Sequence, residues 1–394
     1  MLRDTLASTL LSMLLAGAAS ADVAPASALV RTAASRSGAT SSGWVNFTTS
    51  TNMSILVPVT VNGQTAVAML YGGPSTVDKD FAAAIALKGD ETTAPIAGLE
   101  VQVGDLTLHN MSAGVRPVAS PLYARITGRP MLVQMGEEVF RKFIVDIDFA
   151  HHRLAFRDPA HVVRPKGAVE VPLLQKGDAK ETQWVIPLSL DKAPPAWFEV
   201  ELGNVTGPLL VTRGYAETHG LFDGRPTSER QSGPFHERVV TLDHLDFAGM
   251  GFPHAPIAIV PDSQNPPEGI TGGVGLPLLS HFHLIFDYPH HRLFAIPNTV
   301  ANEAPMPKDR IGLYLAGLRG DLSGGLVVAF VSPRSPAEAG GLKAQDRVVK
   351  IDGKVLADWP PAALVALDMT APGVTHAFTL AGGEVRTVTA RDFF

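Results

Sequence analysis

Residues 59–64 have the sequence Val59-Thr60-Val61-Asn62-Gly63-Gln64, and residues 68–76 have the sequence Ala68-Met69-Leu70-Tyr71-Gly72-Gly73-Pro74-Ser75-Thr76. This pattern favours a strand, a turn and a second strand that ends in a glycine turn. A similar segment begins about 140 residues later, with Val200-Glu201-Leu202-Gly203-Asn204 and then Leu209-Leu210-Val211-Thr212-Arg213-Gly214. Each segment predicts the start of a β-rich unit.

The two units also end alike, in hairpins with paired histidines at their tips. The first hairpin contains Asp148-Phe149-Ala150-His151-His152-Arg153, and the second contains Asp287-Tyr288-Pro289-His290-His291-Arg292. Matching landmarks are Gly63 with Asn204 and Tyr71 with Thr212, both 141 residues apart, and Gly136 with Gly275 and Asp148 with Asp287, both 139 apart. Offsets that agree across different elements predict an internal duplication of one fold unit.

The composition indicates a multidomain protein rich in short strands. The chain has 394 residues, 45% of them hydrophobic, with 37 Gly and 31 Pro, and so many turn-formers favour strands over long helices. The net charge is −6, and no stretch of Lys and Arg is dense enough to neutralise a row of phosphates. We therefore expect no nucleic-acid partner.

The N-terminus has the three parts of a secretory signal. Met1-Leu2-Arg3 is followed by an apolar run from Leu10 to Ala19 and by the small-residue site Ala19-Ser20-Ala21, which predicts cleavage after Ala21. The alternative, a membrane anchor, is disfavoured because the apolar run is shorter than the ~20 residues that span a bilayer. With no cysteine in the chain, we expect an exported bacterial protein, periplasmic or secreted, without a membrane span in the mature chain.

The sequence divides into six predicted parts. They are a signal peptide (1–21), a flexible N-terminus (22–43), a first lobe (44–165), a second lobe (166–297), a linker (298–309) and a C-terminal domain (310–394). The predicted fold class is mainly β, with two tandem β lobes followed by a β-rich α+β domain.

The C-terminal residues resemble a PDZ domain. The motifs that carry the resemblance are Ile311-Gly312-Leu313-Tyr314-Leu315, Ser335-Pro336-Ala337 and Ile351-Asp352-Gly353. The resemblance implies a peptide-binding site at Ile311, Gly312, Leu313, Tyr314 and Leu315, where backbone amides hold the terminal carboxylate of a peptide or protein and the next strand accepts the ligand by strand addition. Tyr314 stands where the family often has a second glycine.

The two lobes resemble aspartic proteases, most closely the retropepsin-like branch found in bacterial exported proteins. Such proteases carry Asp-Thr-Gly or Asp-Ser-Gly in each lobe, and their two aspartates share a proton at the lobe interface. The resemblance places Tyr71 and Thr212 at the aspartate positions, with Gly73 and Gly214 retained two residues later, so that these four residues line the cleft; Gly136 and Gly275 match the buttressing turns. A phenol and an aliphatic hydroxyl cannot replace the dyad, which predicts no catalytic residue and an inactive homologue, a pseudoprotease.

Other acids and histidines offer alternatives. Asp78 and Glu217 follow the two turns and are candidate displaced acids, whereas Asp148 and Asp287 are predicted to be turn aspartates that bind backbone amides. His281 and His283 could hold zinc, but no second-shell pattern supports a metal, and we expect neither metal nor cofactor.

Three functional hypotheses follow. The leading one is an inactive protease homologue that binds an extended peptide in the lobe cleft, on a flap between Leu99 and Gly128, and a peptide or protein C-terminus through the PDZ domain. The second is an active aspartic-type endopeptidase that uses the displaced acids. The third is a PDZ scaffold in which the lobes are structural.

Overall fold

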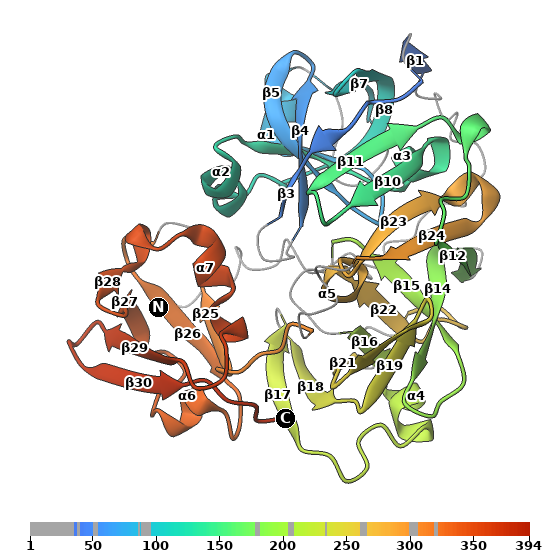
Figure 1. The fold of residues 1–394 in the computed structure, drawn as a ribbon. Helices are drawn as coiled ribbons and strands as arrows, with labels where there is room; N and C mark the ends of the chain where they lie inside the picture. The colour runs from blue at the N-terminus through green and yellow to red at the C-terminus, as the bar shows by residue number, and fades with distance from the viewer. Residues whose placement is uncertain are drawn as a thin grey trace, which may run out of the picture.

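A computed structural model describes most of the chain after residue 34. The described residues are 35–37, 40–49, 54–85, 87, 96–177, 182–203, 209–232, 235–260, 266–298, 306–318 and 322–394. The predicted signal peptide therefore lies outside the described residues. The fold is mainly β, with two β lobes followed by a smaller C-terminal module (Figure 1), which confirms the predicted fold class.

Lobe 1 is built on the hairpin formed by the first two strands quoted above. Asn62 and Gly63 both have positive φ (45° and 84°), as a tight two-residue hairpin turn requires. The sheet has the order β1-β8-β6-β9-β5-β4-β3, and β7 pairs with β4 and β8. The elements are β1 (Ser35–Ser37), β2 (Val45–Asn46), β3 (Thr48–Thr49), β4 (Ile55–Val61), β5 (Gln64–Leu70), β6 (Thr76–Asp78), α1 (Lys79–Ala84), β7 (Ile96–Val103), β8 (Leu106–Arg116), α2 (Pro121–Thr127), β9 (Met131–Met135), α3 (Glu137–Lys142), β10 (Ile144–Asp148), β11 (Arg153–Arg157) and η1 (Pro159–His161).

Lobe 2 repeats the same order of main elements with longer excursions between them. Its sheet has the order β17-β18-β21-β16-β22-β15-β14-β19-β20, and β13 pairs with β14. The elements are β12 (Val169–Pro172), β13 (Leu174–Gly177), β14 (Thr182–Leu190), β15 (Ala196–Glu201), β16 (Leu209–Thr212), α4 (Arg213–Thr218), β17 (Thr227–Ser232), β18 (Phe235–Thr241), β19 (His244–Phe247), β20 (Met250–Pro253), β21 (Pro256–Val260), β22 (Gly272–Gly275), α5 (Leu276–Leu279), β23 (Phe282–Asp287), η3 (Tyr288–His290) and β24 (Arg292–Pro297).

A six-stranded sheet joins the two lobes. Its order is β12-β24-β23-β10-β11-β2, so that the closing hairpins of both lobes pair through β10 and β23. Val145 is opposite Phe286, and Ile147 is opposite Leu284. An offset of 139 residues exchanges these two pairs, which gives the sheet a local two-fold symmetry.

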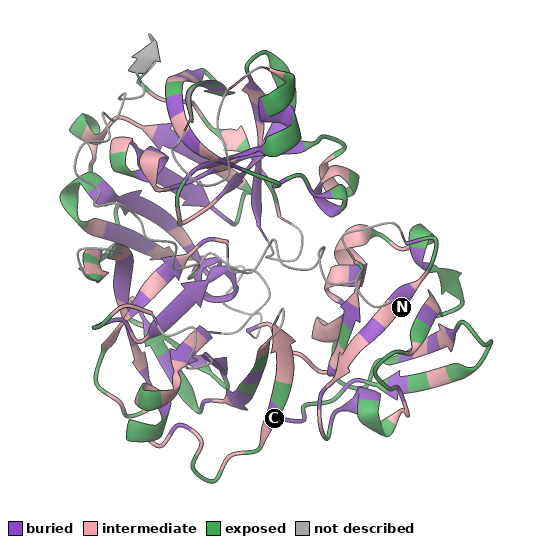
Figure 2. Cartoon of the chain, turned by 180° about the vertical axis from the view of Figure 1, so that it is seen from behind, coloured by how far each residue is buried: buried purple, intermediate pink, exposed green. Residues whose placement is uncertain are grey.

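Aromatic side chains fill the space under this shared sheet. Phe140 of lobe 1 packs against Phe286 and Tyr288 of lobe 2, with ring centroids 5.7 and 5.1 Å apart, and Trp184 packs on Tyr288 at 4.2 Å. The indole N–H of Trp184 also donates to Glu137 Oε1 at 2.7 Å. Most of the buried hydrophobic residues of both lobes belong to one core cluster, and Figure 2 shows the buried residues of the described chain.

The C-terminal module has its own core. Its sheet has the order β25-β26-β27-β29-β30, with β28 paired to β27, and its buried cluster runs from Ile311 to Ala390. The elements are β25 (Leu313–Ala316), β26 (Leu326–Val331), α6 (Pro336–Ala339), β27 (Arg347–Ile351), β28 (Lys354–Val355), η5 (Leu356–Asp358), α7 (Pro361–Val365), η6 (Leu367–Met369), β29 (Thr375–Leu380) and β30 (Val385–Thr389).

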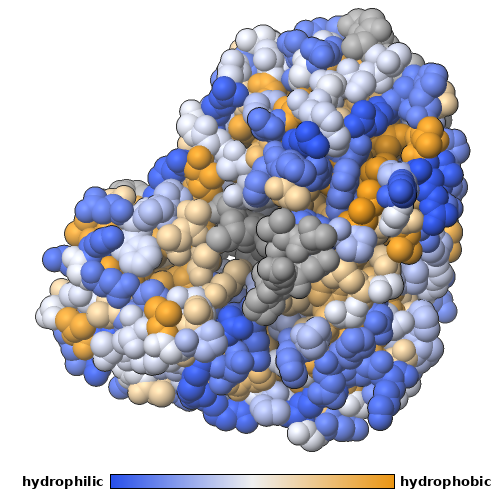
Figure 3. All heavy atoms as spheres, in the orientation of Figure 1, coloured by the Kyte–Doolittle hydropathy of each residue, from blue (hydrophilic) through white to orange (hydrophobic). Residues whose placement is uncertain are grey.

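The module contacts both lobes. On the lobe 1 side, α2 packs against α7, and Arg125 donates to the carbonyl of Leu318 at 2.9 Å. On the lobe 2 side, Ser228 donates to the carbonyl of Pro333 at 2.7 Å. In the space-filling view, the module projects from the side of the two lobes (Figure 3).

Residues Phe393 and Phe394 return to lobe 2. They form a small buried cluster with Val239 and Ala258, and the Phe394 carbonyl accepts from Thr241 Oγ1 at 3.0 Å. The apolar burial of two phenylalanines therefore fastens the far side of the module to lobe 2.

The sequence predicts a flexible N-terminus over residues 22–43. Of these, the structure describes residues 35–37 and 40–43. β1 pairs with β8, and Ser42 is buried, with its hydroxyl accepting from Phe156 N at 2.9 Å. In the described part of the chain, no helix is long and apolar enough to cross a membrane. The other domain boundaries proposed from the sequence stay predictions.

Candidate functional site

The glycine turn after β5 is held by β9 and the turn that follows it. Leu70 is opposite Met135 in the parallel pair, and Tyr71 N donates to the Met135 carbonyl at 2.9 Å. Gly136 then lies so close to this turn that a Cβ on it would be 2.6 Å from Ser75 N, and Gly136 N donates to Ser75 Oγ at 3.0 Å. Only glycine fits at residue 136.

Strand register identifies the equivalent turn in lobe 2. Gly275 precedes α5 as Gly136 precedes α3, and Val274, the residue before it, is opposite Val200 of β15. The residue that follows Val200 is Glu201, so Glu201 is the topological counterpart of Tyr71. Gly203, two residues further on, is the counterpart of Gly73.

The sequence paired Tyr71 with Thr212, whereas the strand register pairs Tyr71 with Glu201. Thr212 is the N-cap residue of α4, and its counterpart in lobe 1 is Asp78, the N-cap residue of α1. Gly214 lies in α4 with no atom within 4 Å of an added Cβ, so it is not a turn glycine of the junction. The error arises because the hairpin and turn lengths of the two lobes differ, so one constant offset cannot align them.

The two glycine turns meet across the lobe junction. A Cβ on Gly203 would be 2.6 Å from the Tyr71 ring, and a Cβ on Gly73 would be 2.7 Å from the other edge of that ring. A Cβ on Gly72 would be 2.7 Å from the Val200 carbonyl of the opposite lobe. The Tyr71 ring thus occupies the space between the two turn glycines, and the lobes approach each other there at backbone distance.

The junction contains one phenol and one carboxyl group at equivalent positions. Burial, followed by the charges of Glu201 and Glu199, raises the pKa of Tyr71 to about 12, although Arg116 opposes this shift. The Glu201 carboxyl lies over Gly273, in the space that a side chain at residue 273 would fill. The phenol therefore stays protonated at any pH near neutral, and the proton-sharing arrangement of two facing carboxyls is not formed by Tyr71 and Glu201.

Glu201-Leu202-Gly203 is the site segment that the sequence reasoning assigned wrongly. It has the acid-x-glycine spacing of the family motif, with glutamate in place of aspartate. The signal was present in the sequence, but the offset of about 140 residues assigned Glu201 to the first strand of lobe 2. In the structure, β14 takes the place of that first strand, and β15 leads to the junction.

Neither candidate displaced acid lies at the turn tips. Asp78 is buried and accepts four backbone N–H bonds, from Asp80, Phe81, Val118 and Ala119, at 3.0–3.2 Å. Those bonds cap α1 and anchor the segment after β8, which is a structural role. Glu217 is exposed on α4.

Asp148 and Asp287 hold the closing hairpins. Asp148 accepts from His151 Nδ1 at 2.7 Å and Arg153 Nε at 3.0 Å, and Asp287 accepts in the same way from His290 and Arg292. Burial alone would raise the pKa of Asp148, but the hydrogen bonds from His151 and Arg153 outweigh it and lower that pKa. The predicted bond to a backbone amide is present for Asp148, which accepts from His151 N at 3.2 Å, whereas the contacts of Asp287 are with the side chains of His290 and Arg292.

The two histidines considered for zinc point to different partners. His283 Nε2 is 2.6 Å from Asp146 Oδ1, and Asp146 also accepts from Arg157 Nε at 2.8 Å. His281 is buried against Phe252, with ring centroids 5.0 Å apart. In the part of the chain that the structure describes, no group of three or more His, Asp or Glu side chains is placed to hold a metal ion.

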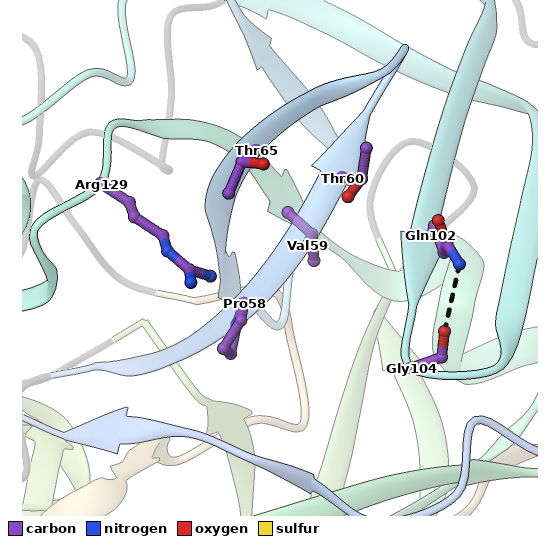
Figure 4. Close-up of a pocket in the computed structure, with 7 residues that line it drawn as sticks. All are labelled: Pro58, Val59, Thr60, Thr65, Gln102, Gly104 and Arg129. Carbon is purple, nitrogen blue, oxygen red and sulfur yellow. Dashed lines mark hydrogen bonds between the residues drawn. The ribbon is translucent and has the colours of Figure 1, made fainter.

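The predicted flap region, residues 99–128, consists of the β7–β8 hairpin and α2. An open hollow lies on the outer side of this hairpin, between β4, β5 and the turn at Gly104 (Figure 4). It is lined by Pro58, Val59, Thr60, Thr65, Gln102, Gly104 and Arg129. Tyr71 and Gly203 are not among its lining residues, so this hollow is separate from the junction.

The loop before β25 is the second candidate site. Ile311 is fully buried, whereas Leu313 is half-buried and Tyr314 is 36% exposed. β25 pairs with β26 on one side only and forms an edge of its sheet. The helix α7 belongs to the same module. An open edge strand can accept a further strand by backbone hydrogen bonding.

Comparisons with known proteins identify this module. Residues 300–376 match the PDZ domain family. The C-terminal module is a PDZ domain. The search of curated proteins finds no match. Among solved structures, the chain is similar to an aspartic proteinase from Irpex lacteus, at 12% identity and a TM-score of 0.40, over 65% of this chain and 97% of that chain.

The PDZ domain also contains a pair of neighbouring acids, Asp309 and Asp368. Burial raises the pKa of Asp309, and burial together with the Asp309 charge raises the pKa of Asp368 to about 7. Arg230 of β17 and Arg310 are the nearby cations that oppose these shifts. Two close carboxyls with raised pKa values share one proton near neutral pH.

The contact between Tyr71 and Gly203 predicts a coupled substitution. Gly203→Ala places a methyl group against the Tyr71 ring, so we expect a loss of about 1–3 kcal/mol in the free energy of unfolding. In a Tyr71→Ala background the same change costs much less, because the ring is absent. Urea unfolding of the four chains measures the coupling. Gly214→Ala, in open space on α4, is the matched control and does not lower stability, because alanine is favoured over glycine in a helix by up to about 1 kcal/mol. An equal cost of Gly203→Ala in both backgrounds would contradict the junction geometry.

The hydrogen bonds of Asp78 predict a purely structural effect. Asp78→Ala removes the acceptor of four backbone N–H groups, and we expect the free energy of unfolding to fall by about 2–4 kcal/mol. Asp80→Ala, an exposed change in the same helical turn, serves as the control and has little effect. If the free energy of unfolding of Asp78→Ala is no lower than that of Asp80→Ala, the structural role of Asp78 is wrong.

The acid pair predicts a pH-dependent stability of the PDZ domain. Because the folded pKa of Asp368 lies above the ordinary value near 4, the folded state binds more protons between about pH 4 and 7, and the stability falls as the pH rises through that window. Asp368→Asn removes this dependence. The gain in stability of the variant over the unaltered chain is therefore larger at pH 8 than at pH 5. Amide hydrogen exchange of β27, compared between the two chains at each pH, measures it. Asp358→Asn, an exposed acid of η5, is the control. If the ratio of the β27 exchange rates in the variant and in the unaltered chain is constant from pH 5 to 8, the predicted effect of Asp368 is wrong.

Proposed function

We propose that this protein is an exported, catalytically inactive relative of the aspartic proteases that binds extended segments of other polypeptides through its PDZ domain and its lobe cleft. The observation that carries the proposal is the junction, where the Tyr71 ring lies between Gly73 and Gly203, Glu201 takes the equivalent position in lobe 2, and the charges of Glu201 and Glu199 act on the phenol. Hydrolysis by this family requires one carboxyl as base and a second as acid, both in contact with one water. The phenol supplies neither role near neutral pH.

The displaced-acid hypothesis receives no support from the geometry. Asp78 uses both carboxyl oxygens for backbone N–H groups, and Glu217 lies on the exposed side of a helix. A catalytic base must reach the reacting water within hydrogen-bond distance, and a carboxyl that is bound to four amides is held away from that task. The acids whose charges act on Tyr71 at the junction are Glu201 and Glu199, both on β15.

Binding without catalysis is supported by the PDZ domain and its placement. β25 offers an open strand edge, and its continuation at Leu318 is held by Arg125 of α2. Lobe 1 also contacts the PDZ domain through α2, which packs against α7. Contacts with both lobes hold the PDZ domain in one position, so its ligand and the lobe cleft can act on one polypeptide. Export rests on the signal-like residues 1–21.

The catalytic part of this proposal is tested by incubating the full chain with reduced, carbamidomethylated lysozyme between pH 3 and pH 7. We expect no fragments above background, and the same for Tyr71→Phe. Cleavage that is blocked by a transition-state peptide inhibitor and abolished by Glu201→Gln would show a working protease.

The binding part is tested with the same unfolded lysozyme as probe. Its addition slows amide hydrogen exchange in β25, and β30, at the opposite edge of the same sheet, is the internal control. Exchange in β25 that is unaffected by the probe, or slowed no more than in β30, would count against peptide binding by the PDZ domain.

A further inference from the structure

Lobe 1 contacts the PDZ domain at the end of its open edge strand. Arg125, in α2 of lobe 1, donates from Nη2 to the carbonyl of Leu318 at 2.9 Å. Leu318 lies two residues after β25, whose other edge is covered by β26. The helix α2 also packs against α7, and Figure 1 shows α2 on the side of the PDZ domain that carries α7 and β25. A guanidinium group of lobe 1 is therefore fixed at the end of the strand that can accept a ligand.

The two elements of the PDZ domain on this side are apolar. Leu315 of β25 and Leu364 of α7 are buried in one cluster, and Leu313 packs against it half-buried. Neither β25 (Leu-Tyr-Leu-Ala) nor α7 (Pro-Ala-Ala-Leu-Val) contains a charged residue. These elements favour apolar ligand side chains and cannot by themselves distinguish an acidic ligand from a basic one.

Arg125 adds a positive charge to this apolar surface. Its side chain is exposed, and α2 contains no other charged residue. Among the residues that the structure describes, no carboxylate pairs with Arg125, and the bond to the neutral Leu318 carbonyl uses one of its five N–H donors. A guanidinium stays protonated throughout the physiological pH range. The charge at the end of β25 is therefore available to an anionic group of a ligand.

The position of this charge along a ligand follows from strand geometry. With the terminal carboxylate at the backbone amides around Tyr314, as the PDZ resemblance implies, the last ligand residue lies beside Leu315. Leu318 is three residues further along the chain, which is roughly 10 Å at the rise of a β-strand. Because the ligand runs along β25 away from the carboxylate loop, its fourth and fifth residues from the end come next to Arg125.

We propose that Arg125 of lobe 1 selects the ligand of the PDZ domain, a polypeptide C-terminus with an apolar last residue and an acidic side chain at the fourth or fifth residue from the end. This inference rests on the proposed peptide-binding function and names the class of ligand. The whole chain carries a net charge of −6, which disfavours acidic ligands at long range. A preference for an acidic ligand therefore requires a local cation, and Arg125 is positioned to supply it.

The test compares two fluorescein-labelled peptides with free C-termini, Gly-Ser-Glu-Glu-Thr-Val-Val and Gly-Ser-Lys-Lys-Thr-Val-Val. They differ only at the fourth and fifth residues from the end, and fluorescence anisotropy measures their affinities for the full chain at pH 7 in low salt. We expect the unaltered chain to bind the Glu-Glu peptide at least about 5-fold more tightly than the Lys-Lys peptide. In Arg125→Ala this ratio falls below about 2-fold, and in Arg125→Glu the Lys-Lys peptide binds more tightly.

Two further variants separate the charge of Arg125 from a structural role. Arg125→Lys keeps the positive charge and therefore keeps a preference for the Glu-Glu peptide. Arg129→Ala is the matched control, because it removes an exposed arginine whose hydrogen bonds are with Thr127 of lobe 1, and it keeps the full preference. A preference that survives in Arg125→Ala would overturn the inference. An unaltered chain that binds the two peptides equally, or binds neither, would overturn it as well, and this result does not depend on whether any variant folds.

The outcome is distinguishable from a failure of the proposed function. If unfolded lysozyme does not slow exchange in β25, peptide binding itself fails, whatever the two labelled peptides do. If it slows exchange and the preference for the Glu-Glu peptide is absent or independent of Arg125, the PDZ domain binds peptides and only the choice of an acidic ligand is wrong.

Discussion

The antiparallel pairing of β10 with β23 is the constraint on which the rest of the structure depends. It places the closing hairpins of both lobes in one sheet, with Ile147 opposite Leu284. Phe140, Phe286 and Tyr288 then fill the space beneath, and complete burial raises the pKa of the Tyr288 phenol. With the hairpins fixed in this way, the glycine turns that precede them in each lobe are brought face to face.

At that meeting point Tyr71 and Glu201 hold equivalent positions in the two turns. Close packing of Gly203 and Gly73 on the Tyr71 ring maintains the approach of the lobes, because a bulky side chain now fills space that would otherwise need ordered water or hydrogen-bonded carboxyls. The acids that remain elsewhere, such as Asp78 and Asp148, use their oxygens to hold helix starts and turns. Stability and chemistry are thus separable in this fold.

The PDZ domain is integrated with the lobes rather than appended to them. Arg125 and Ser228 bond to it from different lobes, and Phe393 and Phe394 extend from its far side into lobe 2. Asp309, just before β25, accepts the backbone N–H groups of Ile311 and Gly312.

The sequence by itself determined the two β lobes and the PDZ domain, because alternating apolar residues, glycine turns and the PDZ motifs are local patterns. It also placed Asp148 and Asp287 at the turns of the closing hairpins. Only the tertiary structure decided that Glu201, and not Thr212, is opposite Tyr71, and that Asp309 binds the loop amides. The physical reason is that strand pairing depends on register and loop length in three dimensions, whereas spacing along the chain changes with every insertion between the strands.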